Sequence, residues 1–216
     1  MPSAAIHQSV AMIVNKKIKL EPSLFMLGSV APDCWRHSEF HNNKKRSHFI
    51  FEETKIPNYN DFAQKYSNHL DQPFVVGYLV HLMTDSYWHL YVRPKYEFVL
   101  NGEMVIKMKD GTLFKGDACG RELFLYKNNR KVIPNIIEKY DISNLESLEE
   151  MPSFKNCINE LDLSGINYTI KYINEVNSKK EEGCSLVYDA EDVCGDIEKC
   201  AEFVILELER FINISV

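Results

Sequence analysis

The segment that most constrains the fold is "GYLVHLMTDSYWHL", residues 77 to 90, which holds three titratable side chains in a strongly apolar stretch. His81, Asp85 and His89 stand four residues apart, and on a helix they fall within about 80° of one another. The rest of that stripe is mostly large and apolar, so we expect a buried helix with the three polar groups inside. A buried carboxylate needs a neutralising partner, which can be a protonated histidine, an arginine or a metal ion.

Apolar positions at helical spacing predict a mainly α fold around this central helix, which we expect to cover residues 72 to 91 and to end or kink at Pro94. Further helices are predicted at residues 3–17, 23–30, 58–70, 118–127, 130–140, 163–178 and 190–212. The Asp110-Gly111 dipeptide suits a tight turn and predicts a β-hairpin at about residues 103–115. Because no repeat or linker interrupts the chain, residues 1–216 are expected to form a single multi-helical domain with the hairpin as an insertion.

Asp33 and its surroundings are predicted to be irregular. Pro32 disfavours helical geometry at Ala31, so Asp33 is expected to begin a loop. The polar, basic stretch of residues 34–46 is predicted to be an exposed loop that returns to the core at His48.

Composition argues against several classes of protein. A net charge of -6 and a pI near 5.7 argue against a stable complex with nucleic acid through a broad basic surface. No stretch reaches the roughly 18 apolar residues of a membrane span, and the first residues do not resemble a signal peptide, so we expect a cytoplasmic protein. The six scattered cysteines are expected to be reduced thiols, and nothing indicates an oligomeric state.

The histidines and aspartates of the amino-terminal part predict a metal site. All seven histidines lie within the first 89 residues, and several stand at element edges or on apolar faces beside an aspartate. Imidazole nitrogen and carboxylate oxygen are the ligands of a catalytic zinc or a related divalent ion. The candidates are His7, Asp33, His48, His81 and Asp85. A hydrogen-bonded core network without metal remains an alternative, because His and Asp at i and i+4 form an ordinary helix pair.

Four motifs occur in an order that resembles one known superfamily. "IHQSVA", "GSVAPD", "RSHF" and "GYLVHLMTDSYWH" are together similar to the zinc-dependent phospholipase C and P1 nuclease superfamily, which has a mostly helical fold with a clustered metal site. The resemblance covers roughly the first 90 residues. It implies that Asp33, His48, His81 and Asp85 surround one ion, and that His7 joins the bridging Asp85 at another.

The chain departs from this superfamily at the remaining ion. That ion is held by a further histidine soon after the HxxxD motif and by a distant histidine with a nearby acid. His89 is the candidate for the first of these, but no histidine follows it. We therefore expect one or two ions, Zn²⁺ or another divalent metal.

The resemblance implies a zinc-dependent hydrolase of phosphoesters, similar to phospholipase C or a phosphodiesterase, that attacks a small anionic phosphoester with a metal-activated water. Asp33 is the candidate general base. A different class of function stays open, a non-catalytic metal-binding scaffold or regulatory protein that retains part of the site. An HD-type phosphohydrolase would require an adjacent His-Asp dipeptide, which this sequence lacks.

Overall fold

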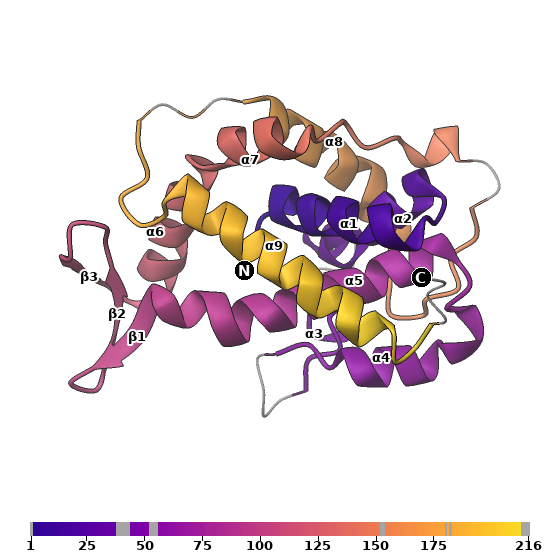
Figure 1. The fold of residues 1–216 in the computed structure, drawn as a ribbon, viewed down its shortest axis with the longest axis horizontal. Coiled ribbons are helices and arrows are strands. Elements are labelled where there is room, and N and C mark those ends of the chain that lie inside the picture. The colour runs from indigo at the N-terminus through magenta and orange to yellow at the C-terminus, as the bar shows by residue number, and fades with distance from the viewer. Residues whose placement is uncertain are drawn as a thin grey trace.

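The computed structural model describes residues 2–37, 44–51, 56–151, 154–179, 181 and 183–212. These residues form a mainly α fold with one small antiparallel sheet, which confirms the predicted fold class (Figure 1). The α-helices are α1 Ala4–Ile18, α2 Pro22–Gly28, α3 Lys44–Ser47, α4 Tyr59–Lys65, α5 Pro73–Tyr87, α6 Ala118–Arg130, α7 Ile133–Tyr140, α8 Ile166–Ser178 and α9 Ala190–Leu208. The shorter segments are η1 Ala31–His37, η2 Ser67–His69, η3 Trp88–Val92, η4 Arg93–Lys95, η5 Leu148–Glu150 and η6 Leu163–Gly165, of which η3 is a π-helical turn and the others are 3-10 helices.

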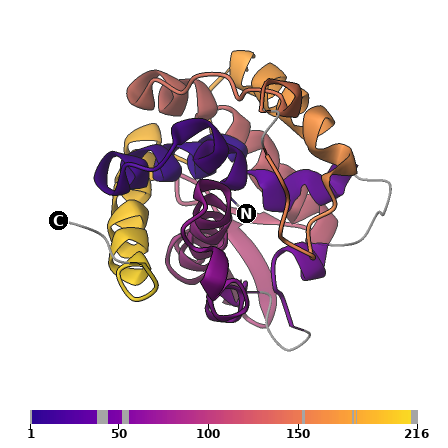
Figure 2. The same cartoon turned by 90° about the vertical axis from the view of Figure 1, so that its right-hand side faces the viewer.

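The predicted buried helix is confirmed as α5. Every residue from Phe74 to Ser86 is buried, and α1, α2, α4 and α9 all pack against this helix (Figure 2). One cluster of buried apolar side chains extends from Ala5 in α1 to Leu208 in α9 and includes both faces of α5. A helix enclosed in this way has no polar side, so its titratable groups must find partners inside the protein.

The region around Asp33 differs from the sequence prediction. Asp33 lies in η1, and the predicted loop of residues 34–46 contains the end of η1 and the start of α3; residues 38–43 of that loop lie outside the described residues. Pro32 explains why α2 does not simply continue, because proline lacks the N–H that an α-helix interior needs but fits the first turn of a new helix. The backbone N–H of Asp33 donates to the carbonyl of Val30, which closes this turn.

The end of the central helix also differs from the prediction. Instead of stopping at Pro94, the chain passes from α5 through the π-helical turn η3 into η4, where proline sits in the first turn. At the other end of the chain, α9 ends at Leu208 rather than at 212.

The predicted hairpin is present and is joined by a third strand. Strands β1 Glu97–Leu100, β2 Glu103–Lys107 and β3 Leu113–Lys115 pair in that order, with Val99 opposite Met104 and Ile106 opposite Phe114. The turn between β1 and β2 places Asn101 and Gly102 at positive φ, the conformation that a tight hairpin requires. This sheet stands at one end of the helical body (Figure 1).

Two further expectations concern membranes and disulfides. In the described part of the chain, no helix is both long enough and apolar enough to span a membrane. All six cysteines are free thiols, as predicted from their spacing, and Cys34, Cys194 and Cys200 are buried.

Helices α2 and α5 approach each other closely because each carries a glycine at the contact. A Cβ atom added to Gly28 would stand 2.2 Å from the carbonyl oxygen of Phe74, and one added to Gly77 would stand 2.1 Å from that of Phe25. Any side chain there would push the two backbones apart. The same contact holds Ser29, the residue after α2, against α5 near His81.

We expect Gly77→Ala to lower the free energy of unfolding by about 1–3 kcal/mol, because the added methyl group overlaps backbone that cannot move without separating α2 from α5. Urea denaturation measures this change. Gly195→Ala is the matched control, since no atom lies within 4 Å of a Cβ at Gly195 in α9. The control should keep or slightly raise stability, because alanine favours a helix interior. Equal losses in the two variants would contradict the role of the close contact.

Candidate metal centre

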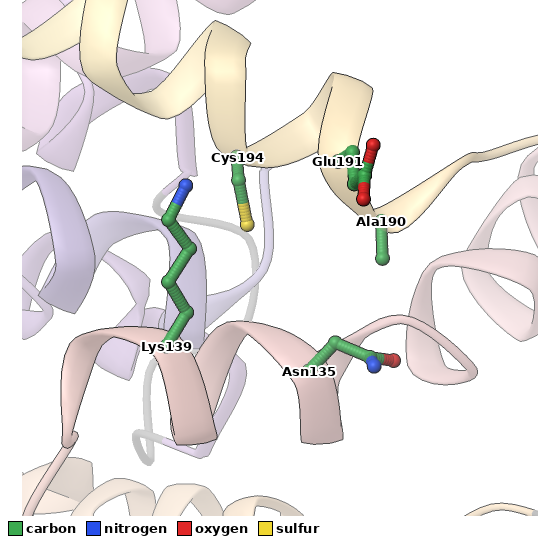
Figure 3. Close-up of a pocket in the computed structure, with 5 residues that line it drawn as sticks. All are labelled: Asn135, Lys139, Ala190, Glu191 and Cys194. Carbon is green, nitrogen blue, oxygen red and sulfur yellow. The ribbon is translucent and has the colours of Figure 1, made fainter.

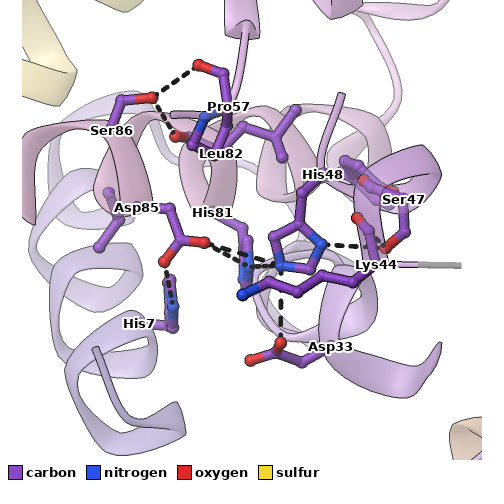
Figure 4. A network of polar contacts seen from close by, with 12 residues as sticks. His7, Asp33, Lys44, Ser47, His48, Pro57, His81, Leu82, Asp85 and Ser86 are labelled. Carbon is purple, nitrogen blue, oxygen red and sulfur yellow. Dashed lines mark hydrogen bonds and ion pairs between the residues drawn. The ribbon is translucent and has the colours of Figure 1, made fainter. Parts of the chain in front are cut away.

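Five of the six predicted ligands converge on one point in the core. His7 comes from α1, Asp33 from η1, His48 follows α3, and His81 and Asp85 stand one turn apart on α5 (Figure 4). Four stretches that lie far apart in the sequence therefore meet at one cluster, as the metal hypothesis requires.

Asp85 contacts all three imidazoles of this cluster. Its Oδ1 lies 3.4 Å from His7 Nε2, and its Oδ2 lies 3.6 Å from His48 Nε2 and 3.9 Å from His81 Nε2. His48 Nε2 also lies 3.5 Å from Asp33 Oδ1 and 3.3 Å from His81 Nε2. Ligands at 2.0–2.2 Å from a tetrahedral zinc stand about 3.3–3.6 Å from one another. The spacing of these donors therefore suits an ion of that size.

Hydrogen bonds behind the rings of His81 and His48 direct one nitrogen of each toward the cluster. His81 Nδ1 lies 2.8 Å from the carbonyl oxygen of Ser29, which can only accept, so the proton is on Nδ1 and Nε2 keeps its lone pair. Ser47 Oγ donates to the carbonyl of Lys44, so it accepts from His48 Nδ1 at 2.9 Å. Metal-binding histidines commonly have such partners, which orient the ring and set its tautomer.

The remaining imidazole and the carboxylates hold atoms without hydrogen-bond partners. Within the described residues, both ring nitrogens of His7, Oδ1 of Asp33 and Oδ1 of Asp85 are buried and make no hydrogen bond. The His7 ring instead stacks on His81, with centroids 3.8 Å apart and planes 5° from parallel. Buried polar atoms are nearly always satisfied in proteins, so these atoms mark a place for a ligand.

Burial and mutual charge give the cluster ionised carboxylates and at least one neutral ring. Burial lowers the pKa of His81 to about 3, so this imidazole is uncharged at neutral pH. Burial tends to raise the pKa of both aspartates, but contacts with charged or hydrogen-bonding groups outweigh it and leave both values below the ordinary range. For Asp33 the main groups are His48 and Arg36, and for Asp85 they are His7 and His81. The cluster thus offers negative oxygen atoms with a neutral nitrogen donor, which favours a divalent cation.

The donors fall into two overlapping groups in the described part of the chain. One consists of His7, Asp33 and His81, and the other of His48, His81 and Asp85, with the donor atoms of each group within 4.8 Å of one another. His81 belongs to both. The resemblance implies instead that Asp85 is shared with His7, and the contact of 3.4 Å between them allows this as well. The assignment of ligands to individual ions stays a prediction.

His89 is the one predicted ligand that the two donor groups of the described residues leave out. It is half-buried in η3, and it is a member of neither group. Four residues of helix place it about 6 Å beyond Asp85 along the axis. His69, which the sequence analysis did not include in the site, pairs with Gln72. The role of His89 as a ligand also stays a prediction.

Sequence reasoning missed the two serines that orient the rings. Ser29 lies inside "GSVAPD" and Ser47 inside "RSHF", so the motifs contain the ligands together with their orienting partners. Tyr78 of α5 donates its hydroxyl to the carbonyl of Ser47 and so helps to hold His48 in place. The sequence could have indicated Ser47, because this residue is adjacent to His48. It could not have indicated Ser29, because the contact of its carbonyl with His81 depends on the packing of α2 against α5.

A comparison with protein families agrees with this geometry. The model of the family described as zinc dependent phospholipase C matches residues 1–150, which include every predicted ligand. The chain belongs to the zinc dependent phospholipase C family. No curated protein and no solved structure gives a match.

The donors present fit the zinc of this family. Imidazole nitrogen and carboxylate oxygen are normal zinc ligands, the spacing suits a tetrahedral ion, and the unpartnered atoms of His7, Asp33 and Asp85 would gain a partner. Another pocket lies between α7 and α9 and is lined by Asn135, Lys139, Ala190, Glu191 and Cys194 (Figure 3). It contains none of the predicted ligands, so the buried cluster stays the candidate zinc site.

We expect zinc to raise the melting temperature of chelator-treated protein, because an ion that binds only the folded state adds about 2.7 kcal/mol at a hundredfold excess over its Kd. Asp85→Asn should abolish most of this shift, since it removes the negative charge of the carboxylate that contacts all three imidazoles. Differential scanning calorimetry and element analysis measure the two effects.

His69→Ala is the matched control for this experiment, because it removes an imidazole outside the cluster. It should keep both the zinc content and the zinc-dependent shift. If Asp85→Asn retained full zinc content and the full shift, Asp85 would not be a ligand.

Proposed function

We propose that this chain is a zinc-dependent hydrolase of phosphoesters, in which His7, Asp33, His48, His81 and Asp85 hold one or two divalent ions. The observation that carries the proposal is the convergence of these five side chains on one buried cluster with unpartnered donor atoms. A divalent ion in such a site lowers the pKa of a bound water from 15.7 to about 7 and stabilises the charge that develops on a phosphoryl group. Family membership supports the same chemistry.

Substrate would reach the site from the side of η1. The Asp33 side chain is 19% exposed, whereas Asp85 is 6% exposed and the three imidazoles are buried still more deeply. Arg36 stands on the same segment with its Nε 3.7 Å from Asp33 Oδ1, and its side chain is 47% exposed. A guanidinium placed there can donate two hydrogen bonds to phosphoryl oxygen atoms.

Asp33 has the position to orient an attacking water. Its pKa lies well below the ordinary value, because the contacts with His48 and Arg36 outweigh the effect of burial, so it is ionised and accepts hydrogen bonds. A carboxylate with so low a pKa is a weak proton acceptor. We therefore propose that Asp33 holds the ion and orients the water. The proton of that water would pass to solvent on the exposed side of the site, next to η1.

The alternative of a non-catalytic zinc scaffold is supported by the absence of any histidine after His89. A site that lacks the distal histidine of the superfamily holds fewer ions, and a single ion can serve structure alone. The two functions differ in one respect that can be measured, which is turnover of a phosphoester by zinc-loaded protein.

We expect zinc-loaded protein to hydrolyse at least one of bis(4-nitrophenyl) phosphate, 4-nitrophenyl phosphate and phosphatidylcholine in mixed micelles, with activity lost on chelation and restored by zinc. Asp33→Asn should lower kcat by about 10²–10⁴-fold, because it loses the anionic acceptor that orients water. Release of nitrophenolate or phosphate measures the rates.

Asp117→Asn is the control, because Asp117 caps α6 outside the site and asparagine caps a helix equally well. It should keep the wild-type rate. Full zinc content without hydrolysis of any of the three substrates would refute the enzyme and favour the scaffold.

A further inference from the structure

A segment that follows the family-matched residues is bonded to two of the elements that carry predicted ligands. We call residues 156–162 the strap. The match to the zinc dependent phospholipase C family ends at residue 150, so the strap is not part of it. Figure 2 shows this orange stretch beside the purple part of the chain that holds η1 and α3. Two backbone carbonyls of the strap accept hydrogen bonds from Cys34 in η1 and from Arg46 in α3.

The first of these contacts holds η1. Cys34 directly follows Asp33, and its thiol donates to the carbonyl oxygen of Asp162, with the sulfur and the oxygen 3.0 Å apart. Cys34 is 1% exposed, and burial raises the pKa of its thiol to about 12, so the group keeps the proton that it donates. The short helix η6, which begins directly after Asp162, also packs against η1. The segment that carries Asp33 is therefore tied to the strap one residue away from this predicted ligand.

The second contact holds α3. Arg46 stands two residues before His48, and its Nη2 donates to the carbonyl oxygen of Asn159 at 2.6 Å. His48 is joined to α3 through its backbone N–H, which donates to the carbonyl oxygen of Lys44 at 2.9 Å. A shift of α3 would therefore move the imidazole of His48 with it.

A second route joins the strap to α3 through the core. The backbone N–H of Asn159 donates to the hydroxyl oxygen of Tyr66 at 2.8 Å. The ring of Tyr66 packs against Phe62, which stacks on Tyr78. Tyr78 donates in turn to the carbonyl oxygen of Ser47 in α3. The strap therefore holds α3 from its exposed side through Arg46 and from its buried side through this row of rings.

The strap has contacts of its own that keep it in place. Asn156 Oδ1 accepts from the backbone N–H of Ile158, and Asn156 Nδ2 donates to the carbonyls of Ile158 and Leu161. The side chains of Ile158 and Leu161 are both buried in the core. The carbonyls of Asn159 and Asp162 are therefore presented to Cys34 and Arg46 from a fixed backbone.

We infer that the strap positions the ligands of the candidate metal centre, and that Cys34 and Arg46 are the positioning residues through which it acts. Asp33 Oδ1 and His48 Nε2 lie 3.5 Å apart, although they come from separate elements. The strap bonds both elements, each within two residues of a ligand, so it fixes this separation. Groups that hold metal ligands from behind commonly change metal affinity by about 10–100-fold. The inference rests on the zinc site of the proposed function, but it does not require hydrolysis.

Arg46→Ala tests this inference, because Arg46 is exposed and its replacement leaves the core intact. We expect a Kd for zinc about tenfold higher than that of the wild type, since α3 and His48 become free to move relative to Asp33. Competition with a chromophoric chelator measures the Kd. The visible absorption of the cobalt-loaded protein should change as well, because it depends on the geometry of the ligands. The melting temperature of chelator-treated protein should change little, since one exposed hydrogen bond contributes about 1 kcal/mol.

Lys45→Ala is the matched control, because Lys45 is the exposed neighbour of Arg46 in α3 and carries the same charge. Among the described residues, no hydrogen bond joins its side chain to the strap. It should keep the zinc Kd and the cobalt spectrum of the wild type. Cys34→Ala removes the other donor and should also raise the zinc Kd. Cys194→Ala, which removes a buried thiol on α9, is its control and should not.

Two results would overturn the positioning role. One is a zinc Kd and a cobalt spectrum that Arg46→Ala and Cys34→Ala share with their controls, even if their melting temperatures fall, because the strap would then serve stability alone. This result would leave the proposed hydrolase intact. The other is a wild-type protein that binds no zinc, which would also refute the proposed function. Weaker zinc binding by both variants of a protein that hydrolyses no phosphoester would refute the enzyme and retain the positioning role.

Discussion

The burial of two ionised carboxylates among three imidazoles is the interaction on which the rest of this structure depends. Asp33 and Asp85 keep their negative charges inside a helical core, although burial alone would favour their neutral forms. Their contacts come from rings on α1, directly after α3 and on α5, so the site ties these elements together. Because burial keeps the His81 ring neutral, this ring adds no positive charge to offset the two carboxylates. The same feature that makes this core costly makes it a candidate binding site for a cation.

The close contact between α2 and α5 keeps the ring of His81 in position within the cluster. Gly28 and Gly77 let the two backbones approach, and the carbonyl of Ser29 then reaches the ring of His81. Precision at a metal site requires rings whose rotation is limited by packing and by hydrogen bonds from behind. A glycine contact far from the chemistry therefore contributes to the geometry of the ligands.

The family match covers the part of the chain that carries the candidate site. Membership of the zinc dependent phospholipase C family covers residues 1–150 and includes all the candidate ligands. Helix α8 lies beyond that match, although it packs against η1, the segment that carries Asp33.

The sequence by itself determined the mainly α fold, the buried stripe on α5 and the set of candidate ligands, because helical period and motif order are local properties of a chain. It did not determine that Asp33 lies in η1, that His81 belongs to both donor groups, or that His89 belongs to neither. Nor did it indicate the contact of Ser29 with His81 or that of Arg46 with Asn159. These features depend on how elements far apart in the sequence pack against one another. Side-chain distances of 3 to 4 Å between such elements are set by the packing of the whole core, so only the tertiary structure decides them.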